Sequence, residues 1–384
     1  MKLLLLLALI SALCFLQNVV ESKKSSKKKT PKPYKKPPYP TKPSSIKYYT
    51  SKELGAQLIH DIDGTLKYLS NTTCLHFKKD SKKLYKIGIN FYSNKKYSKV
   101  ELSTSSKKPT KVYLRKGIKK NDLLFFIGLA LGLVPEITRN DGSLNVEVIK
   151  SNIKKSNYEK YYKVKQYDYK IIANTSFDFH SVMLPSRKFK GVKGRLTYKF
   201  RGYLSKYNEK SVNDLKDFTY NDVKRLWYLH YDKCQKYNCF SGGYLETSCD
   251  KCVCPEPFAG EKCKKIRKNN EKKCGKTQTF EADLSKRNHT IEVDRSSCYY
   301  SIKSKEGKKV QFNILNFTSS IGSGCDLGFR LEVKYRNDKG ATGLRLCENY
   351  TNIIFPAISS EVNLIFYNVG KNKLEFSYNE VQEN

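Results

Sequence analysis

The chain of 384 residues is predicted to be a multidomain protein with an α+β domain, then a small disulfide-rich module, then an all-β sandwich. Residues 48–233 mix helical and alternating apolar patterns, which is typical of an α+β domain. Ten of the twelve cysteines lie between Cys234 and Cys347, and alternating apolar patterns continue after residue 274. A hydrophobic content of 39% is enough to build packed cores, so a wholly disordered chain is excluded.

Residues 1–21 are predicted to be a signal peptide, with Lys2 ahead of an apolar run from Leu3 to Leu16. The run is short for a membrane span, and the sequence has no later apolar stretch of about 20 residues. We therefore expect a secreted, extracellular protein without a transmembrane anchor. Five N-x-[ST] sequons fit this route as glycosylation sites, namely Asn71, Asn174, Asn288, Asn316 and Asn349.

The formal net charge is +37, and residues 22–47 contribute ten lysines and no acid to it. This Lys/Pro-rich segment is predicted to be an extended tail, whose role is a solvated spacer, a pro-segment or a polyanion tether. The remaining charge has two interpretations: a general lysine bias with solvated side chains, or a surface that binds polyanions such as glycosaminoglycan or anionic membrane. The scarcity of arginine counts against the second, and nucleic acid is not an expected partner.

The first elements of the α+β domain are a helix and several half-buried strands. Apolar residues at helical spacing predict an amphipathic helix over 54–69, with Leu54, Leu58, Ile59, Ile62, Leu66 and Leu69 on one face. Alternating apolar residues then predict strands, at Ile87, Ile89 and Phe91 and again at Val112 and Leu114.

A second helix is predicted in the apolar segment LLFFIGLALGLV, which follows Asn121 and Asp122. Either of these two residues can cap the helix, and Gly132 can end it in a left-handed turn before Pro135. Because the helix is apolar on every face, we expect it to be buried.

This helix carries a resemblance to a known family. The segment FFIGLALGLVPEITRND resembles the zinc helix of the astacin metalloproteases, H-E-x-x-H-x-x-G-x-x-H-E followed by R and D; the matching residues are Ala130, Leu131, Gly132, Glu136, Arg139 and Asp141. Three further segments are similar to the family in register: Thr73–Phe77, Val148–Tyr162, and Phe177–Pro185, in which Met183 is the methionine of the family's Met-turn. The resemblance implies an astacin-like (metzincin) fold for residues 48–233.

The residues that carry the family's chemistry are replaced in this sequence. The three zinc histidines correspond to Phe125, Leu129 and Pro135, the catalytic glutamate to Phe126, and the Met-turn tyrosine to Pro185. Zinc needs lone-pair donors, and its bound water needs a base, but these side chains offer neither. The five histidines of the chain are scattered without an H-x-x-x-H pair. We therefore expect no zinc or other cofactor, no catalytic residue, and a dry, repacked cleft. Glu136, which in the family looks toward the mature N-terminus, is expected to make an ordinary polar contact.

The last third of the chain resembles two extracellular modules. Residues 234–266 resemble an EGF-like module whose cysteines include Cys239, Cys249, Cys252, Cys254 and Cys263; a zinc ribbon is the disfavoured rival. Residues 274–382 resemble a CUB domain, which implies the pairs Cys274–Cys298 and Cys325–Cys347. Alternation supports a sandwich here, with strands around Val310–Ile314, Phe329–Val333, Leu364–Phe366 and Leu374–Phe376.

Cys74 and Cys234 leave two pairings open. In the family, Cys74 pairs with a cysteine at the end of the protease domain, which would be Cys234. Alternatively Cys234 belongs to the EGF-like module and Cys74 is free.

Three functions are compatible with the sequence. The first is a secreted, catalytically inactive astacin-like protein that binds extracellular proteins as a binder or decoy through its EGF-like and CUB modules. The second is an active zinc metalloendopeptidase that cleaves extracellular proteins with unrecognised ligands. The third is a basic surface protein that binds polyanionic glycans. The first is favoured, because the residues do not support turnover.

Overall fold

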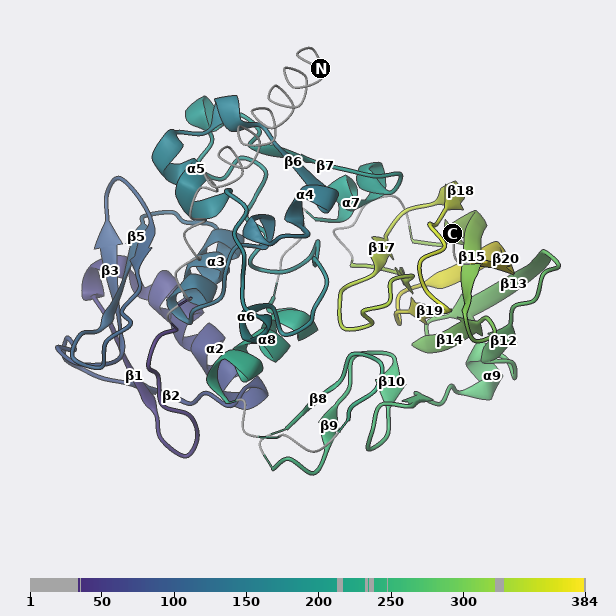
Figure 1. The fold of residues 1–384 in the computed structure, drawn as a ribbon, viewed down its shortest axis with the longest axis horizontal. Helices are drawn as coiled ribbons and strands as arrows, with labels where there is room; N and C mark the ends of the chain where they lie inside the picture. Colours follow the sequence, from purple (N-terminus) through teal and green to yellow (C-terminus); the bar gives the residue numbers. More distant parts are fainter. Residues whose placement is uncertain are drawn as a thin grey trace, which may run out of the picture. The chain divides into compact units, whose positions relative to one another are not determined.

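The computed structural model describes residues 34 and 36–382, apart from 213–216, 232–233, 235–237, 247 and 322–327. The predicted signal peptide, half of the predicted tail (residues 22–33 and 35), and Cys325 lie outside the described residues. The chain is an α+β domain, which is the part that resembles the astacins, followed by a disulfide-rich module and a β sandwich (Figure 1). No helix among the described residues is both long enough and apolar enough to cross a bilayer.

The astacin-like domain begins with a five-stranded sheet in the order β2-β1-β3-β5-β4. Its first four strands in that order are parallel, and β4 is an antiparallel edge strand. The strands are β1 (Ile46–Thr50), β2 (Phe77–Lys79), β3 (Ile89–Asn94), β4 (Lys99–Glu101) and β5 (Thr110–Arg115). Phe91, Val112 and Leu114 are buried, as their alternation predicts.

Helices dominate the rest of this domain. They are α2 (Ala56–Thr72), α3 (Lys120–Ala130), α4 (Gly142–Asn145), α5 (Lys155–Tyr161), α6 (Tyr169–Ile172), α7 (Ser205–Ser211) and α8 (Tyr220–His230). Short 3-10 turns lie at Lys52–Leu54, Glu136–Thr138, Lys150–Asn152 and Val192–Gly194, and β6 (Val146–Val148) pairs with β7 (Tyr198–Phe200). Helix α2 buries Ile62, Leu66 and Leu69, which confirms the predicted amphipathic helix.

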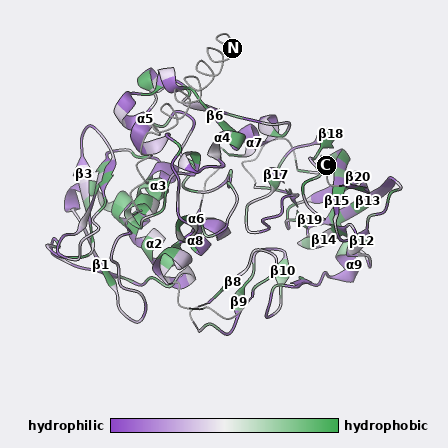
Figure 2. Ribbon diagram, in the orientation of Figure 1, coloured by the Kyte–Doolittle hydropathy of each residue, from purple (hydrophilic) through white to green (hydrophobic). Residues whose placement is uncertain are grey.

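Helix α3 is buried as predicted, and Figure 2 shows hydrophobic residues gathered along it. The predicted cap was wrong, because the helix begins at Lys120 and Lys119 is its N-cap without a side-chain hydrogen bond. Asp122 instead lies in the first turn, where its carboxylate faces the positive end of the helix dipole. Gly132 has a φ of 95°, so the predicted left-handed turn follows the helix directly.

The last residues of the predicted tail differ from a solvated spacer, because from Lys36 onward they pack on the α+β domain. Tyr39 is 8% exposed, and its hydroxyl lies 2.9 Å from Ala130 O at the end of α3 and 2.7 Å from Thr110 Oγ1 in β5. Lys36 Nζ donates to Leu229 O at 2.7 Å. The free energy gained by burying the Tyr39 ring and by hydrogen-bonding its hydroxyl outweighs the electrostatic repulsion between neighbouring lysines.

Of the two pairings left open by the sequence, the structure has the second: Cys234 belongs to the disulfide-rich module, and Cys74 is free. The three disulfides of the module are Cys234–Cys249, Cys239–Cys252 and Cys254–Cys263, and Cys74 is buried. Burial raises the pKa of the Cys74 thiol to about 12, so it stays protonated at neutral pH. Two hairpins complete the module: β8 (Tyr244–Leu245) with β9 (Cys252–Val253), and β10 (Phe258–Ala259) with β11 (Lys265–Ile266).

The sandwich follows a one-turn helix, α9 (Glu271–Cys274). One sheet has the order β12-β14-β19-β16-β17 and the other β13-β20-β15-β18. The strands are β12 (Thr279–Glu281), β13 (Arg287–Asp294), β14 (Cys298–Lys303), β15 (Lys308–Ser319), β16 (Leu331–Lys334), β17 (Leu344–Leu346), β18 (Tyr350–Ile354), β19 (Glu361–Phe366) and β20 (Lys371–Gln382). A disulfide joins Cys274 to Cys298, and Cys347 is also disulfide-bonded.

Polar contacts join the sandwich to the loop before Met183. Asp338 Oδ2 accepts hydrogen bonds from Ser176 N at 2.7 Å and from Asn221 Nδ2 at 2.9 Å. Arg336 donates to Phe177 O, and its guanidinium lies 4.8 Å from the Phe179 ring centroid. The sandwich therefore helps to hold the same loop that packs beneath α3.

The anchoring of the tail by Tyr39 can be tested by removing one hydroxyl. The variant Tyr39→Phe should lower the free energy of unfolding by about 1 kcal/mol, since Thr110 and Ala130 lose a buried partner. Urea denaturation of the full chain measures this. Tyr85→Phe is the matched control, because Tyr85 is 79% exposed and should change stability little. Equal effects in both variants would refute the anchoring role.

Candidate functional site

The candidate site lies on α3, at the positions that the resemblance assigns to zinc binding and catalysis. Phe125 and Phe126 are 0% and 1% exposed, and Leu129, one turn later, is partly buried. Pro135 follows the left-handed turn at Gly132 and is also buried. One helix and its C-terminal turn therefore bring these four apolar side chains together.

The two phenylalanines belong to an aromatic cluster. Phe189 lies between them and α5, with its ring centroid 5.0 Å from Phe125, 5.9 Å from Phe126 and 5.3 Å from Tyr161. Edge-to-face pairs at such distances stabilise beyond simple burial, by about 0.5–1.5 kcal/mol each. Lys190 Nζ lies over this cluster, 5.6 Å from the Phe189 centroid and 6.0 Å from that of Phe126.

Met183 packs closely against helix α3. A Cβ atom placed on Gly128 of α3 would lie only 2.4 Å from Met183 Sδ, so the loop approaches the helix as closely as a glycine permits. Glu136 N donates to Met183 O at 2.9 Å, which ties the loop to the turn after α3. Pro185 is buried, and its carbonyl accepts a hydrogen bond from Tyr198 Oη at 2.7 Å.

These residues do not fit a zinc ion. Phe, Leu and Pro side chains carry no lone pair to coordinate a metal, and their rings and methyl groups pack where imidazoles would have to converge. Within the part of the chain that the structure describes, no group of three or more His, Cys, Asp or Glu side chains could hold a metal elsewhere. Phe, Leu and Pro side chains at these positions can pack, but none of them can act as a nucleophile or as a base toward water.

Glu136 does more than the ordinary polar contact expected of it. The carboxylate is fully buried between two arginines, with Oε1 2.8 Å from Arg225 Nη1 and Oε2 3.3 Å from Arg139 Nε. Oε1 also accepts from Asp178 N at 3.0 Å. Arg139 makes a two-pronged pair with Asp141, at 2.7 and 2.9 Å. Although burial raises the pKa of Asp141, this pairing with Arg139 brings it below its usual value.

Sequence reasoning missed the two residues of α8 that hold the Met183 loop. Asp222 accepts from Ser181 Oγ at 2.6 Å and from Val182 N at 3.0 Å. Arg225 donates to Thr175 Oγ1 at 2.8 Å and to Ser176 O at 3.1 Å. The only available signal was the Thr219-x-x-Asp222 capping box, which marks a helix start and not the loop that it holds.

A cleft of about 860 Å³ remains beside the aromatic cluster. Phe126, Leu184 and Phe189 contribute apolar surface to it, and basic side chains stand around them. Lys190 Nζ reaches across to β4 and donates to Ser98 O at 3.0 Å. Apolar side chains therefore pack around α3, as expected, but an open cleft with both apolar and basic lining residues remains beside the helix.

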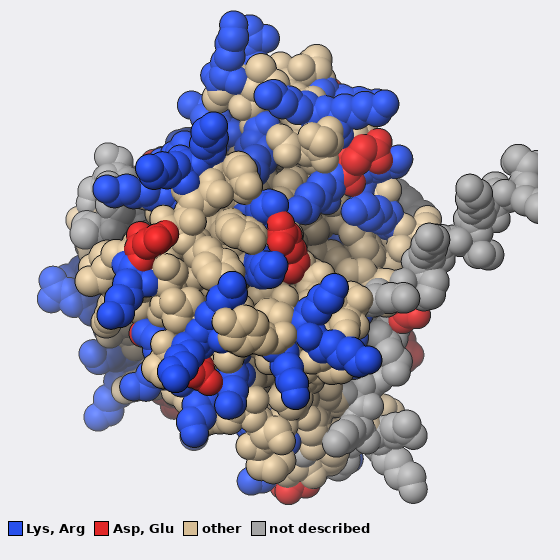
Figure 3. All heavy atoms as spheres, turned by 90° about the vertical axis from the view of Figure 1, so that its left-hand side faces the viewer, with Lys and Arg blue, Asp and Glu red and all other residues tan. Residues whose placement is uncertain are grey.

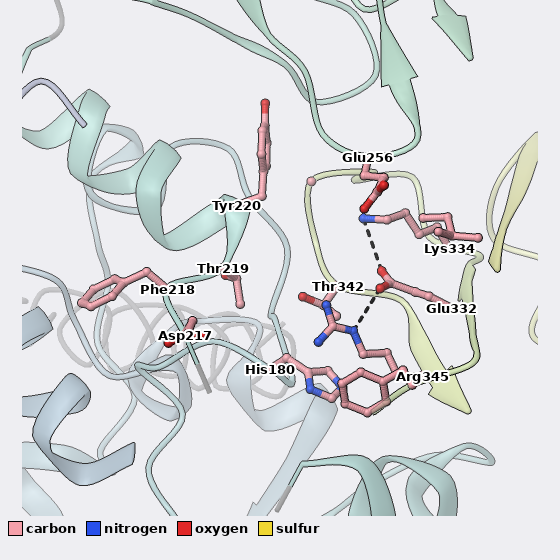
Figure 4. Close-up of a pocket in the computed structure, with 13 residues that line it drawn as sticks. His180, Asp217, Phe218, Thr219, Tyr220, Glu256, Glu332, Lys334, Thr342 and Arg345 are labelled. Atoms are coloured by element: carbon pink, nitrogen blue, oxygen red, sulfur yellow. Dashed lines mark hydrogen bonds and ion pairs between the residues drawn. The ribbon is translucent and has the colours of Figure 1, made fainter. Parts of the chain in front are cut away.

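A second, smaller pocket of about 340 Å³ lies where the three parts of the chain meet (Figure 4). Its central carboxylate, Glu332, accepts from Arg345 Nε at 3.0 Å and Tyr367 Oη at 2.7 Å, and Lys334 Nζ lies 3.5 Å away. Burial raises the pKa of Glu332, but Arg345 and Lys334 bring it far below its usual value. All of these partners lie in the sandwich itself, so this fully paired carboxylate is suited to stabilising that domain and not to acid–base chemistry.

The sequon asparagines lie mostly at the surface. Asn71, Asn174, Asn288 and Asn349 are exposed, whereas Asn316 lies half-buried in β15. Glycosylation at these five positions stays a prediction.

Comparison with known proteins identifies the family. Residues 35–227 match the family model described as Astacin (Peptidase family M12A). This chain belongs to the astacin family. Among curated proteins, it is similar to zinc metalloproteinase nas-34 of Caenorhabditis elegans, at 28% identity over 66% of this chain and 40% of that protein. It is also similar to zinc metalloproteinase nas-23 of the same organism, at 26% identity over 58% of this chain and 42% of that protein. This astacin-family chain thus spans less than half the length of these two relatives.

Two solved structures are each similar to part of the chain. High choriolytic enzyme 1, a hatching enzyme zinc-protease from Oryzias latipes (medaka fish), covers 48% of this astacin-family chain and 88% of its own, with 20% identity and a TM-score of 0.40. The CUB1-EGF-CUB2 domain of human MASP-1/3 covers 40% of this chain and 58% of its own, with 17% identity and a TM-score of 0.21.

The buried pair of Glu136 and Arg225 should be far more important for stability than a surface pair of the same length. Glu136→Gln should lower the free energy of unfolding by about 3–5 kcal/mol, since the buried guanidinium of Arg225 loses its nearest carboxylate while Arg139 keeps Asp141. Glu159→Gln is the matched control: its pair with Lys163 is also 2.8 Å long but half exposed, and should be worth less than about 1 kcal/mol. Chemical denaturation compares them, and similar losses would contradict the assigned role.

His230 should make stability depend on pH. Its Nε2 lies 2.8 Å from Leu131 O, and burial lowers its pKa from 6.5 to about 4. The unfolded chain therefore binds a proton that the native chain does not, and the free energy of unfolding should fall, by about 2 kcal/mol, as the pH drops from 6.5 toward 4.

Denaturation curves at several pH values test this expectation. His230→Gln should flatten the fall over that range, whereas His60→Gln, which changes an exposed histidine of α2, should leave it unchanged. If the free energy of unfolding of the His230→Gln variant falls with pH as steeply as that of the wild type, the pH dependence belongs to other groups.

Proposed function

We propose that this chain is a secreted, non-catalytic member of the astacin family that binds extracellular proteins. The observation that carries the proposal is the packing of Phe125 and Phe126 against Phe189, at positions where the family resemblance places a zinc histidine and the catalytic glutamate. A metalloendopeptidase needs a Lewis acid and a base at these positions, and phenylalanine supplies neither.

The rest of the chain supports a binding role. The disulfide-rich module and the sandwich, which we propose to be EGF-like (234–266) and CUB (274–382) domains, are module types commonly used in protein recognition; this step is an analogy of fold. The disulfides support an extracellular location, where they persist. The contacts of Asp338 and Arg336 with the loop at 176–179 support a binder whose modules act together.

Metal content and turnover test the proposal directly. The purified secreted chain should contain well under one zinc per molecule, and a chelator should not shift its melting temperature, because no binding free energy would be lost. A broad peptide library should remain uncut, while an active astacin protease in the same assay should cleave it. One tightly bound zinc per chain together with chelator-sensitive cleavage would establish the metalloendopeptidase alternative instead.

A further inference from the structure

The amino-terminal sheet of the astacin-like domain carries a strong excess of positive charge. Between residues 77 and 120 the sequence has fifteen lysines and arginines but only two acids, Asp80 and Glu101. Figure 3 shows the side of the molecule that β1, β3 and β5 occupy in Figure 1, and Lys and Arg side chains far outnumber acidic ones there. Such a surface creates a positive potential that attracts anions.

The excess extends into the cleft beside the aromatic cluster. We call this the basic cleft, defined by six cationic side chains that line it: Lys96, Arg115, Lys119, Arg187, Lys188 and Lys190. Among its lining residues, Asp122 is the one acid. Burial lowers the pKa of Lys190; the carboxylate of Asp122 opposes this shift, and the charge of Arg115 adds to it.

Most of these cations are available to a ligand. Lys96, Arg115, Lys119 and Lys188 are exposed, and none of them forms an ion pair with an acid in the described part of the chain. Arg187 pairs with Glu209 at 3.2 Å. Four unpaired charges from β5, the loops around it and the loop before Phe189 therefore converge on one hollow of about 860 Å³.

The backbone beside the cleft is poorly suited to an extended peptide. A peptide would add to the sheet at its edge strand β4, by bonding to free backbone groups. Two lysines already donate to backbone carbonyls in β4 or just before it. Lys190 Nζ, from the loop after Phe189, donates to Ser98 O at 3.0 Å, and Lys160 Nζ, from α5, donates to Val100 O at 3.4 Å. Recognition here must rely on charge and side chains and not on strand pairing.

We infer that the basic cleft binds a sulfated glycosaminoglycan. Its sulfates match the unpaired cations, and its sugar hydroxyls match the exposed hydroxyl of Ser186, which lines the same hollow. The exposed ring of Tyr97, 42% accessible, offers a flat surface for a sugar. An anionic bilayer fits less well, because the cations surround a concavity. The inference rests on the proposed function, since such glycans are met outside the cell.

Binding to immobilised heparin over a series of salt concentrations tests the inference on the full secreted chain. The variant Lys96→Gln/Lys119→Gln/Lys188→Gln removes three unpaired charges of the basic cleft. It should bind roughly tenfold more weakly at physiological salt, since it can form three fewer exposed ion pairs with sulfates. The slope of log affinity against log salt should fall by about two to three, because fewer counterions are released.

The matched control is Lys268→Gln/Lys276→Gln/Lys286→Gln, which removes the same charge from exposed positions between β11 and β13. It should weaken heparin binding by less than about twofold. Equal weakening in both variants would overturn the assignment, because net charge alone would then explain binding.

Competition distinguishes the class of ligand. Chemically desulfated heparin, polyglutamate and phosphatidylserine vesicles should each compete poorly with heparin. Equal competition by polyglutamate or by the vesicles would overturn the glycan assignment in favour of an acidic protein or a membrane. Zinc content and peptide cleavage, measured on the same preparation, report separately on the proposed function, because heparin affinity does not depend on either.

Discussion

The burial of helix α3 is the constraint on which the rest of the site depends. Its Gly128 allows Met183 to approach within contact distance, and its Phe125 and Phe126 pack against Phe189. Because every face of α3 is apolar, the sheet, the Met183 loop and α5 must all cover it. The same packing that stabilises the domain therefore fills the place where a catalytic centre would need polar, partly hydrated groups.

Around this apolar centre, buried charges fix the loop that would otherwise be free to move. Glu136, Arg139, Asp222 and Arg225 are nearly inaccessible to solvent, and each is compensated by an opposite charge or by backbone groups of the loop at 175–183. Desolvating a charge is costly, so such a network is tolerable only when all of its partners are in place. The buried charges of this domain therefore position the loop at 175–183 closely.

The basic cleft shows a related balance. Lys190 contributes to it by crossing from the Phe189 loop to Ser98, above aromatic rings that favour a cation. Asp122 attracts its ammonium group and Arg115 repels it, so a single carboxylate faces several cations in this cleft. The cleft is thus apolar where it meets the aromatic cluster and positively charged around it.

Local spacing was sufficient to predict several parts of this protein. The periods of about 3.6 and 2 residues identified α2, the buried α3 and the strands of the sandwich, because side-chain direction repeats along a helix or strand whatever lies around it. The cysteine density identified a disulfide-rich module, and the side chains of Phe125, Phe126, Leu129 and Pro135 could be recognised as unable to ligate a metal.

Only the tertiary structure decided which distant residues meet. Four features follow no period in the sequence: the disulfide partner of Cys234, the burial of Tyr39, the ion pair of Glu136 with Arg225 across 89 residues, and the hydrogen bond from Lys190 to Ser98 across 92 residues. Such contacts depend on how whole elements pack, and a single buried charge or ring finds its partner only after the layers around it have been assembled.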